Sequence, residues 1–319
     1  MHRKSNMKAA QIKKYGGSEV VEINDAPEPT LSLGKVLIEV HAAGVNPVDW
    51  KIREGYLHQM APLQFPATLG GDFSGNVTGV GTGVSVFKKG DKVYGQASIL
   101  GGGSGSFAEF VLADPKIVAH KPENVSYVEA AALPLAGMSA WQTLVGHINL
   151  AKGQKLLIHG GAGGIGTIAI QLAKHLGAYV ATTVSSKDMQ YAKELDADEV
   201  IDYKNQSFED LLHEYDAVFD TVGGETYKKS FKVLKKGGII VSMVEQADAE
   251  LMKKYGVRAV SQFTQVNGNQ LSELIKLVDQ HVIKVYVDKV FPLEQAGEAL
   301  TYLQEGHPKG KVVLKIKKS

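Results

Sequence analysis

The sequence contains no cysteine among its 319 residues, and its charges nearly balance, with 35 Lys and Arg against 34 Asp and Glu. The missing cysteines exclude disulfides, thiolate metal sites and cysteine nucleophiles, and they fit a reducing compartment. A formal net charge of +1 argues against nucleic acid or an acidic membrane as the main partner. No apolar run approaches the roughly 20 residues of a membrane span, and residues 1–7 are basic without the apolar region of a signal peptide. We therefore expect a cytoplasmic globular protein with no membrane span and no nucleic-acid partner.

A glycine-rich turn lies near the middle of the chain, between a short apolar run and a helical pattern. Residues 156–158 read Leu-Leu-Ile, which is typical of a strand buried on both faces. Gly161, Gly163 and Gly166 follow in the spacing G-x-G-x-x-G, and apolar residues then recur at helical spacing up to residue 176. Strand, turn and helix in this order let backbone N–H groups and the helix dipole meet a pyrophosphate. The pattern predicts dinucleotide binding, and a glycine turn without a ligand is the alternative.

The patterning divides the chain into two predicted domains of an α/β protein. Residues 8–124 consist mostly of short strands and turns, which is typical of an irregular, barrel-like β domain. From residue 153, strands are expected at 155–159, 178–184, 198–202, 216–220, 238–243 and 257–262. Helices between them predict a doubly wound parallel sheet, the Rossmann fold. We assign residues 125–264 to this dinucleotide-binding domain, and residues 1–124 and 265–319 to the other domain.

The end of the second strand of this sheet indicates which nicotinamide cofactor binds. In an NAD site an acidic residue about 20 positions after the first glycine accepts hydrogen bonds from the ribose 2′-hydroxyl. Here the strand is followed by Ser185, Ser186 and Lys187, so two hydroxyls and a cation stand where the acid is expected. This set suits a 2′-phosphate, and we predict NADPH rather than NADH. The alternative is that the two serines only cap a helix and that Lys187 is a solvated charge. Asp188 also weakens the local positive field.

Six short motifs occur in order along nearly the whole chain, at residues 44–52, 65–75, 134–141, 161–166, 220–224 and 306–313. The first reads Gly-Val-Asn-Pro-Val-Asp-Trp-Lys-Ile, and the last reads Gly-His-Pro-Lys-Gly-Lys-Val-Val. With these motifs the sequence resembles the medium-chain dehydrogenase/reductase superfamily, and more narrowly its zinc-free quinone oxidoreductase and enone reductase branch. The resemblance implies a GroES-like β domain, a Rossmann domain, NADPH as cofactor and a homodimer.

The positions that hold catalytic zinc in related alcohol dehydrogenases carry no zinc ligands here. The first cysteine ligand of those enzymes matches Asn46, the histidine matches Gly71, and the second cysteine falls near residues 135–136. A catalytic zinc takes three nitrogen, sulfur or carboxylate ligands from the protein, and the lobe for structural zinc has no counterpart. We therefore expect no metal. Without a Lewis acid, the substrate has to accept hydride readily, as quinones and α,β-unsaturated ketones do.

The resemblance implies a role for three residues near the N-terminus in such a reduction. Asn46 matches a position beside the nicotinamide and the substrate, and it also fits an Asn-Pro turn. Lys51 matches a lysine of several plant enone reductases; it would stabilise an enolate and supply a proton, or it is a solvated lysine on a short helix. Tyr56 would line the substrate pocket. Lys311 would either approach the substrate or only begin a strand.

The same resemblance carries over the cofactor contacts. Gly163, Gly164 and Ile165 should meet the pyrophosphate, and Ser185, Lys187 and Tyr203 the adenosine end. The ribose and nicotinamide should lie near Thr221, Val222, Gly223, Ser242, Met243, Phe263 and Thr264. Two other functions stay open at this point. A trans-2-enoyl thioester reductase would need a basic patch for a coenzyme A phosphate, which we cannot locate, and a non-catalytic NADPH-binding sensor or RNA-associated protein is disfavoured by the near-neutral charge.

Overall fold

The structure, a computed structural model, describes residues 6–317. The chain divides into two compact units. The first unit comprises Met1–Leu135, Val266–His281 and Val285–Ser319, and the second comprises Ala136–Gln265 with Val282–Lys284. The C-terminal segment therefore joins the N-terminal unit, while the middle of the chain forms a unit of its own.

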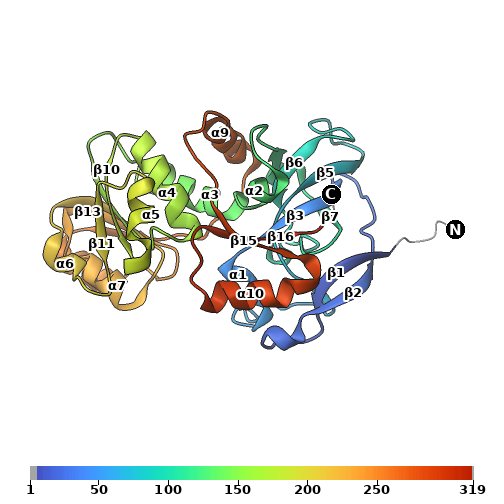
Figure 1. The fold of residues 1–319 in the computed structure, drawn as a ribbon, viewed down its shortest axis with the longest axis horizontal. Helices are drawn as coiled ribbons and strands as arrows, with labels where there is room; N and C mark the ends of the chain where they lie inside the picture. The colour runs from blue at the N-terminus through green and yellow to red at the C-terminus, as the bar shows by residue number, and fades with distance from the viewer. Residues whose placement is uncertain (1–5, 318–319) are drawn as a thin grey trace. The chain divides into compact units, whose positions relative to one another are not determined.

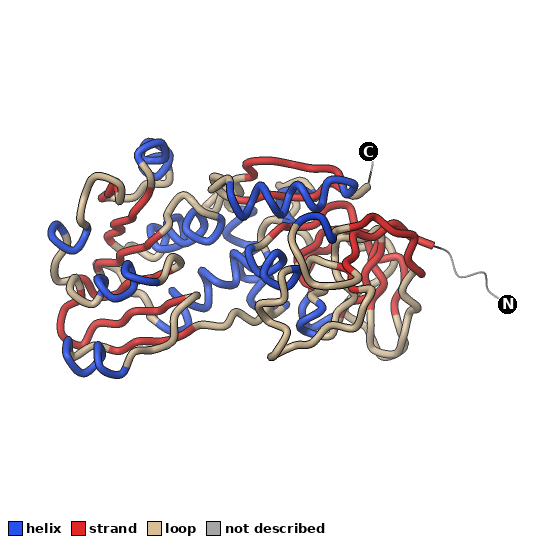
Figure 2. The backbone as a smooth tube through the Cα atoms, turned by 90° about the horizontal axis from the view of Figure 1, so that it is seen from below, coloured by secondary structure: helices blue, strands red, loops and turns tan. Residues whose placement is uncertain are grey.

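The first unit is built mainly of strands, drawn in red in Figure 2. Its strands are β1 (Asn6–Ile12), β2 (Glu22–Pro27), β3 (Val36–Val45), β4 (Ala67–Thr68), β5 (Asp72–Val80), β6 (Lys92–Gln96), β7 (Phe110–Ala113), β8 (Val118–His120), β15 (Val287–Pro292) and β16 (Lys311–Lys315). One sheet has the order β15-β16-β3-β5-β6-β8 with β7 paired to β3, and a smaller sheet has the order β2-β1-β4. The helices are α1 (Pro47–Arg53), α2 (Tyr127–Ala131), α9 (Gly268–Asp279) and α10 (Ala296–Glu305).

The second unit is a parallel sheet whose strands alternate with helices (Figures 1 and 2). Its strands are β9 (Lys155–His159), β10 (Tyr179–Val184), β11 (Glu199–Asp202), β12 (Tyr215–Asp220), β13 (Leu234–Ser242) and β14 (Arg258–Ser261). The helices are α4 (Gly164–His175), α5 (Met189–Glu194), α6 (Phe208–Leu211), α7 (Gly224–Ser230) and α8 (Ala249–Tyr255). They are preceded by α3 (Pro134–Trp141), which belongs to this unit from Ala136 onward. The strand order is β11-β10-β9-β12-β13-β14, with every pair parallel. This is the doubly wound order of a Rossmann sheet, which confirms the predicted fold class.

The strands predicted in this unit are confirmed, and the largest shift concerns β13. The strand begins at Leu234 rather than at residue 238, because Leu234 already pairs with Tyr215 before an irregularity in the register. Residues 235–238 read Lys-Lys-Gly-Gly and separate Leu234 from the apolar run that begins at residue 239, so the start of the strand is not visible as periodicity.

Residues 125–135 lie in the first unit, whereas the sequence assigned them to the dinucleotide-binding domain. Two hydrogen bonds tie α2 to β5: Ser74 Oγ donates to Tyr127 O at 2.6 Å, and the Tyr127 hydroxyl donates to Asn76 Oδ1 at 2.5 Å. The helical pattern of this segment was evident from the sequence, but the sheet on which it packs was not.

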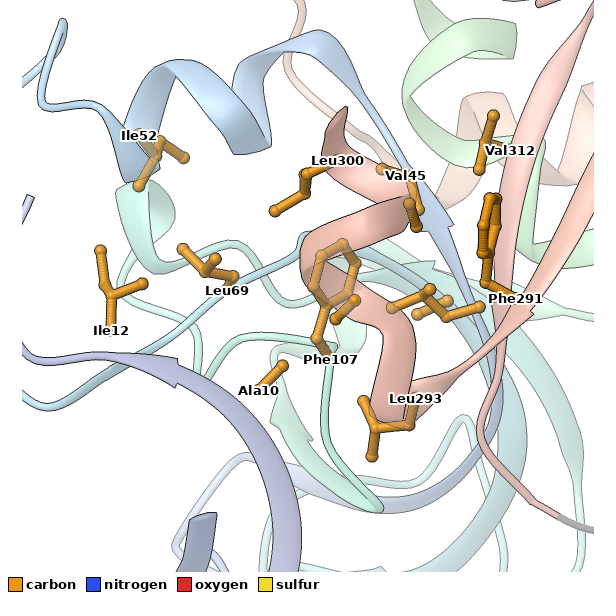
Figure 3. Packing of buried hydrophobic residues seen from close by; sticks show 14 of the residues in the cluster. Ala10, Ile12, Val45, Ile52, Leu69, Phe107, Phe291, Leu293, Leu300 and Val312 are labelled. Carbon is orange, nitrogen blue, oxygen red and sulfur yellow. The ribbon is translucent and has the colours of Figure 1, made fainter. Parts of the chain in front are cut away.

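The hydrophobic core of the first unit sets the register between β3 and β16, the two strands next to the candidate site. Val45 on β3 and Val312 on β16 are register partners, and both are fully buried in a cluster that includes Ile52 of α1 (Figure 3). Burying a valine side chain contributes roughly 1.5–3 kcal/mol, so a slip of one residue would expose the whole apolar set and is strongly disfavoured. The neighbours of this pair, Asn46 and Lys311, are thereby brought together.

Candidate functional site

The glycine turn between β9 and α4 leaves no room for a side chain at two of its glycines and leaves room at the third. A Cβ atom would lie 2.1 Å from Thr182 Oγ1 at Gly161, and 2.2 Å from the carbonyl oxygen of Gly160 at Gly166. At Gly163 the nearest such atom is 3.3 Å away, and no other lies within 4 Å. The first and third glycines therefore allow the tight turn and the close packing of helix on strand, and the second leaves room for a ligand to approach the backbone.

The first turn of α4 supplies the groups that such a ligand needs. Gly163 is the N-cap of this 12-residue helix, and Gly164 and Ile165 are its first residues. N–H groups in the first turn of a helix have no intrahelical acceptor, and the dipole favours a negative charge at this end. The residues present at the turn therefore fit a dinucleotide pyrophosphate.

The residues predicted for the adenosine end lie together where β10 and β11 finish. The Tyr203 backbone N–H donates to Val184 O at 3.1 Å, which places it beside the segment from Ser185 to Lys187. Lys187 is exposed, and Tyr203 is 53% exposed. Both side chains are therefore available to a ligand at this edge of the sheet.

Both predicted serines already have carboxylate partners, which the sequence did not reveal. Ser185 Oγ donates to Asp188 Oδ2 at 2.5 Å, and Ser186 Oγ donates to Asp202 Oδ2 at 2.5 Å. The hydrogen bond from Ser186 holds the pKa of Asp202 below its usual value, so this carboxylate is ionised at neutral pH. Ser185 is buried, so its hydroxyl stabilises the loop before α5.

Four of the residues predicted for the ribose and nicotinamide hydrogen-bond to Asp220, a site residue that the sequence reasoning did not name; they are Val222, Gly223, Ser242 and Met243. Asp220 Oδ1 accepts from the backbone N–H groups of Val222 and Gly223 at 3.0 and 2.9 Å, and Oδ2 accepts from Ser242 Oγ at 2.7 Å. The Met243 N–H donates to Asp220 O at 2.9 Å, and Thr221 Oγ1 donates to His159 O at 2.8 Å. An acidic residue at the end of a buried strand was the available signal, since a buried carboxylate needs such donors.

Ser242 and Thr264 are occupied by contacts within the second unit. The Ser242 hydroxyl also accepts from the N–H groups of Val244 and Glu245 at 3.2 and 3.0 Å. Thr264 Oγ1 hydrogen-bonds to Ser139 Oγ at 2.8 Å and accepts from Gln262 Nε2 at 3.1 Å. In contrast, the side chains of Phe263 and Val222 are 72% and 55% exposed. The two hydroxyls therefore shape the strand ends, and the two apolar side chains are free to contact a ligand.

A buried polar cluster in the first unit contains Asn46. Its Nδ2 donates to Asp72 Oδ2 at 2.9 Å, and its Oδ1 accepts a short hydrogen bond from Lys311 Nζ. Asp72 Oδ2 also accepts from the Leu135 N–H at 3.0 Å, and Oδ1 accepts from Gln96 Nε2 at 3.2 Å. Asn46 and Leu135, which match two of the positions that hold zinc in alcohol dehydrogenases, thus both donate to the Asp72 carboxylate, and Gly71, at the third position, directly precedes Asp72.

Burial shifts the charged groups of this cluster toward their neutral forms. Asp49, whose Oδ2 accepts from the Asn46 backbone N–H at 2.7 Å, has its pKa raised by burial to about 7. Burial also raises the pKa of Asp72 and lowers that of Lys311, while the attraction between the ammonium and the two carboxylates opposes both changes. The ammonium of Lys311 and the carboxylate of Asp72 therefore each offset part of the cost that burial imposes on the other's charge.

Lys51 and Tyr56 lie outside this cluster. Lys51 Nζ stands 5.6 Å from the ring centroid of Trp50, and the Tyr56 ring packs edge-on against Trp50 at 5.9 Å. The Tyr56 side chain is 69% exposed and borders an open cavity of about 550 Å³, lined by Tyr15, Glu54, Gly55, Tyr56, His58 and Gln59. Tyr56 therefore borders an open cavity, and its contact with a substrate stays a prediction. Lys51 is neither in the lining of this cavity nor in hydrogen-bond contact with Asn46.

Two family models match the chain. The alcohol dehydrogenase GroES-like domain matches residues 32–123, and the zinc-binding dehydrogenase model matches residues 195–314. A chloroplast envelope quinone oxidoreductase homolog of Arabidopsis thaliana is 33% identical over 326 residues, covering 97% of this chain and 98% of that protein. The chain belongs to the medium-chain dehydrogenase/reductase superfamily.

Further likenesses place this medium-chain reductase in the branch predicted from its motifs. An NADPH-dependent alkenal/one oxidoreductase of Arabidopsis thaliana is 36% identical, covering 97% of this chain and 79% of that protein. The solved quinone oxidoreductase of Coxiella burnetii is 36% identical, with a TM-score of 0.91 over 98% of this chain and 100% of the other. The resemblance to quinone oxidoreductases and enone reductases is thereby confirmed, and the protein is an oxidoreductase.

The described residues were also compared with what a metal site and a membrane-spanning helix require. Between residues 6 and 317, no group of three His, Asp or Glu side chains is arranged to hold a metal ion. Within the same residues, no helix of this reductase combines the length and the apolar character that crossing a membrane requires.

Proposed function

We propose that this reductase transfers hydride from NADPH to quinones or to α,β-unsaturated ketones, and that it does so without a metal ion. NADPH supplies the hydride when it is bound. The missing zinc ligands at positions 46, 71 and 135–136 support the metal-free reaction. The names of the two Arabidopsis relatives, one a quinone oxidoreductase homolog and one an alkenal/one oxidoreductase, support the two substrate classes.

The second unit would hold the cofactor through a small number of groups. The open backbone at Gly163 and the free N–H groups of Gly164 and Ile165 would bind the pyrophosphate. The exposed Lys187 would meet the 2′-phosphate, and the ring of Tyr203 would lie against the adenosine. Thr221, Val222, Gly223 and Phe263 would border the ribose and the nicotinamide.

The observation that carries the proposal is the fixed orientation of the Asn46 amide. When hydride reaches an enone or a quinone, negative charge develops on the carbonyl oxygen, and a preorganised donor stabilises it. The Asn46 Nδ2 group has two hydrogens, and one of them has no acceptor in the described part of the chain. We assign that hydrogen to the substrate oxygen.

Lys51 is the second group that we assign to the substrate. Its ammonium would stabilise an enolate and then supply the proton that completes the reduction of an enone. A quinone becomes a hydroquinone by protonation on oxygen, which water can supply, so Lys51 should matter more for enones. Tyr56, at the border of the open cavity, would contact the acceptor.

An activity screen tests the proposal. The purified protein is mixed with NADPH and with quinones, enones or an enoyl thioester, and the absorbance of the reduced nicotinamide is followed. We expect turnover of quinones or enones that persists after dialysis against a chelator. Turnover of the thioester alone would identify a thioester reductase instead, and cofactor binding without any turnover would identify a sensor.

Lys51→Ala refines the screen, with the exposed Lys14→Ala as its control. We expect the enone kcat of Lys51→Ala to fall by about a hundredfold, the effect of losing a general acid, with a smaller change for quinones. Unchanged enone turnover would make Lys51 a surface lysine. A homodimer and a cytoplasmic location remain part of the proposal, and sedimentation would test the first.

A further inference from the structure

Lys311 is a buried cation with well-defined partners. It is 5% exposed at the start of β16, and its Nζ donates to Val45 O at 3.0 Å and to Asn46 Oδ1. The charged groups that face it are Asp72 and Asp49. A buried ammonium is costly unless it is paired, so its position calls for a reason beyond strand formation.

The Asn46 amide is held at both ends by groups of opposite charge. Its oxygen faces the Lys311 ammonium, and its nitrogen donates to the Asp72 carboxylate at 2.9 Å. Rotating the amide by half a turn would set its oxygen against the carboxylate and its N–H groups against the ammonium. Hydrogen bonds to charged groups are stronger than those between neutral groups, and the rotated amide would lose both of them, so the observed orientation is strongly favoured.

We propose that Lys311 is a positioning residue, which fixes the Asn46 amide so that its remaining Nδ2 hydrogen is presented to the carbonyl oxygen of the acceptor. This inference rests on the proposed function, because the orientation of the Asn46 amide matters for catalysis only if Asn46 donates to the substrate during the reduction. The ammonium also polarises the amide through Oδ1, which makes the remaining N–H a stronger donor. Its charge thus acts through Asn46 and not by contact with the substrate.

The competing explanation is that Lys311 only neutralises Asp72 and Asp49. A double-mutant cycle with Lys311→Met and Asn46→Leu separates the two, because residues that act as a unit have non-additive effects on kcat. We expect each single variant to lower kcat by about 10- to 100-fold, toward the range found for losing one oxyanion donor. The double variant should be no slower than Asn46→Leu alone, with the dissociation constant of NADPH unchanged throughout.

Two outcomes would overturn the inference. One is a Lys311→Met variant that keeps the wild-type kcat, and the other is a double variant whose loss equals the product of the two single losses. The matched control is Lys315→Met, the same change on an exposed residue of the same strand, which should keep wild-type kcat. If Lys311→Met does not fold, Lys311→Gln enters the same cycle, and its neutral amide should give an intermediate kcat.

A measurement without cofactor or substrate keeps this inference distinct from the proposed function. The side-chain amide signal of Asn46 in a ¹H–¹⁵N spectrum is identified by its loss in Asn46→Leu. We expect Lys311→Met to move this signal and to speed its hydrogen exchange, while Lys315→Met leaves it in place. An unmoved signal contradicts the positioning role even if the enzyme is active, whereas a wild-type protein that reduces no acceptor contradicts the proposed function alone.

Discussion

The hydroxyl of Ser186 donates a 2.5 Å hydrogen bond to Oδ2 of Asp202, across the ends of two neighbouring parallel strands. Asn205 Nδ2 donates to the same oxygen at 2.7 Å, and the Lys204 N–H donates to Oδ1 at 3.0 Å. The edge of the sheet where we place the cofactor 2′-phosphate therefore carries an ionised carboxylate. The Asp202 carboxylate accepts the hydrogen bond of the Ser186 hydroxyl, and its negative charge repels another negative charge placed beside it.

We predict that Asp202→Asn strengthens the preference for NADPH over NADH. Asparagine keeps an oxygen that can accept from the Lys204 N–H but removes the repulsion, which is about 1 kcal/mol for two charges 4 Å apart in water and corresponds to roughly fivefold in affinity. Dissociation constants from fluorescence titration measure the ratio. Asp210→Asn, an exposed acid on α6, should leave the ratio unchanged. A shift toward NADH would show that Asp202 does not face the phosphate.

Lys187→Glu should raise KM for NADPH far more than KM for NADH. The side chain is exposed beside Ser186, so the reversal of its charge acts mainly on a phosphate that only NADPH carries. Steady-state kinetics with both cofactors measure the effect, and Lys193→Glu on α5 is the matched control. Equal increases in the two KM values would remove Lys187 from the 2′-phosphate site.

The two glycines of the turn should respond differently to alanine. At Gly166 the new methyl group would meet the Gly160 carbonyl oxygen at 2.2 Å, so we expect a loss of about 1–3 kcal/mol in the free energy of unfolding. At Gly163 the contact is 3.3 Å, so the fold should tolerate the methyl group while NADPH binding weakens by tenfold or more. Thermal melts and fluorescence titrations separate the two effects. Normal NADPH binding by Gly163→Ala would place the pyrophosphate elsewhere.

Features that depend on residues close together in the sequence could be predicted, whereas contacts between residues far apart in the sequence could not. The glycine turn and the six strands of the second unit depend on neighbouring residues, so their spacing is visible in the chain. The Lys311–Asn46 contact joins residues 265 positions apart and exists only because β16 pairs with β3. For the same reason Lys311 had two interpretations in the sequence, and only the register distinguishes them.

Hydrogen-bond partners of the predicted cofactor residues were equally hidden. Ser186 follows the end of β10 whereas Asp202 ends β11, and Ser242 meets Asp220 only across the β12–β13 pair. The sequence identified which residue types gather at the strand ends, because parallel strands finish at one edge of the sheet. It could not say which hydroxyls are already engaged by carboxylates.

The burial of His159 leads us to expect that the free energy of unfolding depends on pH. It is fully buried at the end of β9, between Thr183 Oγ1 at 3.0 Å and Ser230 Oγ at 2.8 Å, and burial lowers its pKa to about 4 from 6.5. Between these two pKa values the unfolded chain binds a proton at His159 and the folded protein does not. The contribution of neutral His159 to the free energy of unfolding is therefore complete above the unfolded pKa and is lost as the pH falls toward 4.

Urea unfolding at several pH values tests this sign. Wild type should lose up to about 3 kcal/mol more than His159→Gln between neutral pH and the folded pKa of His159. The difference between the two proteins is the useful quantity, because Asp49, with its raised pKa, contributes in the opposite direction. Parallel pH profiles for the two proteins would mean that His159 titrates normally.

The central claim is direct hydride transfer to a metal-free, hydrogen-bonded acceptor, and deuterium labelling tests it most directly. The chelator-treated protein is given NADPH that carries deuterium at the transferring position of C4, together with an α,β-unsaturated ketone, and the product is analysed by mass spectrometry. We predict one deuterium at the β-carbon, with the α-hydrogen drawn from solvent. A reduced product without deuterium, or activity that disappears with the chelator and returns with zinc, would contradict the account.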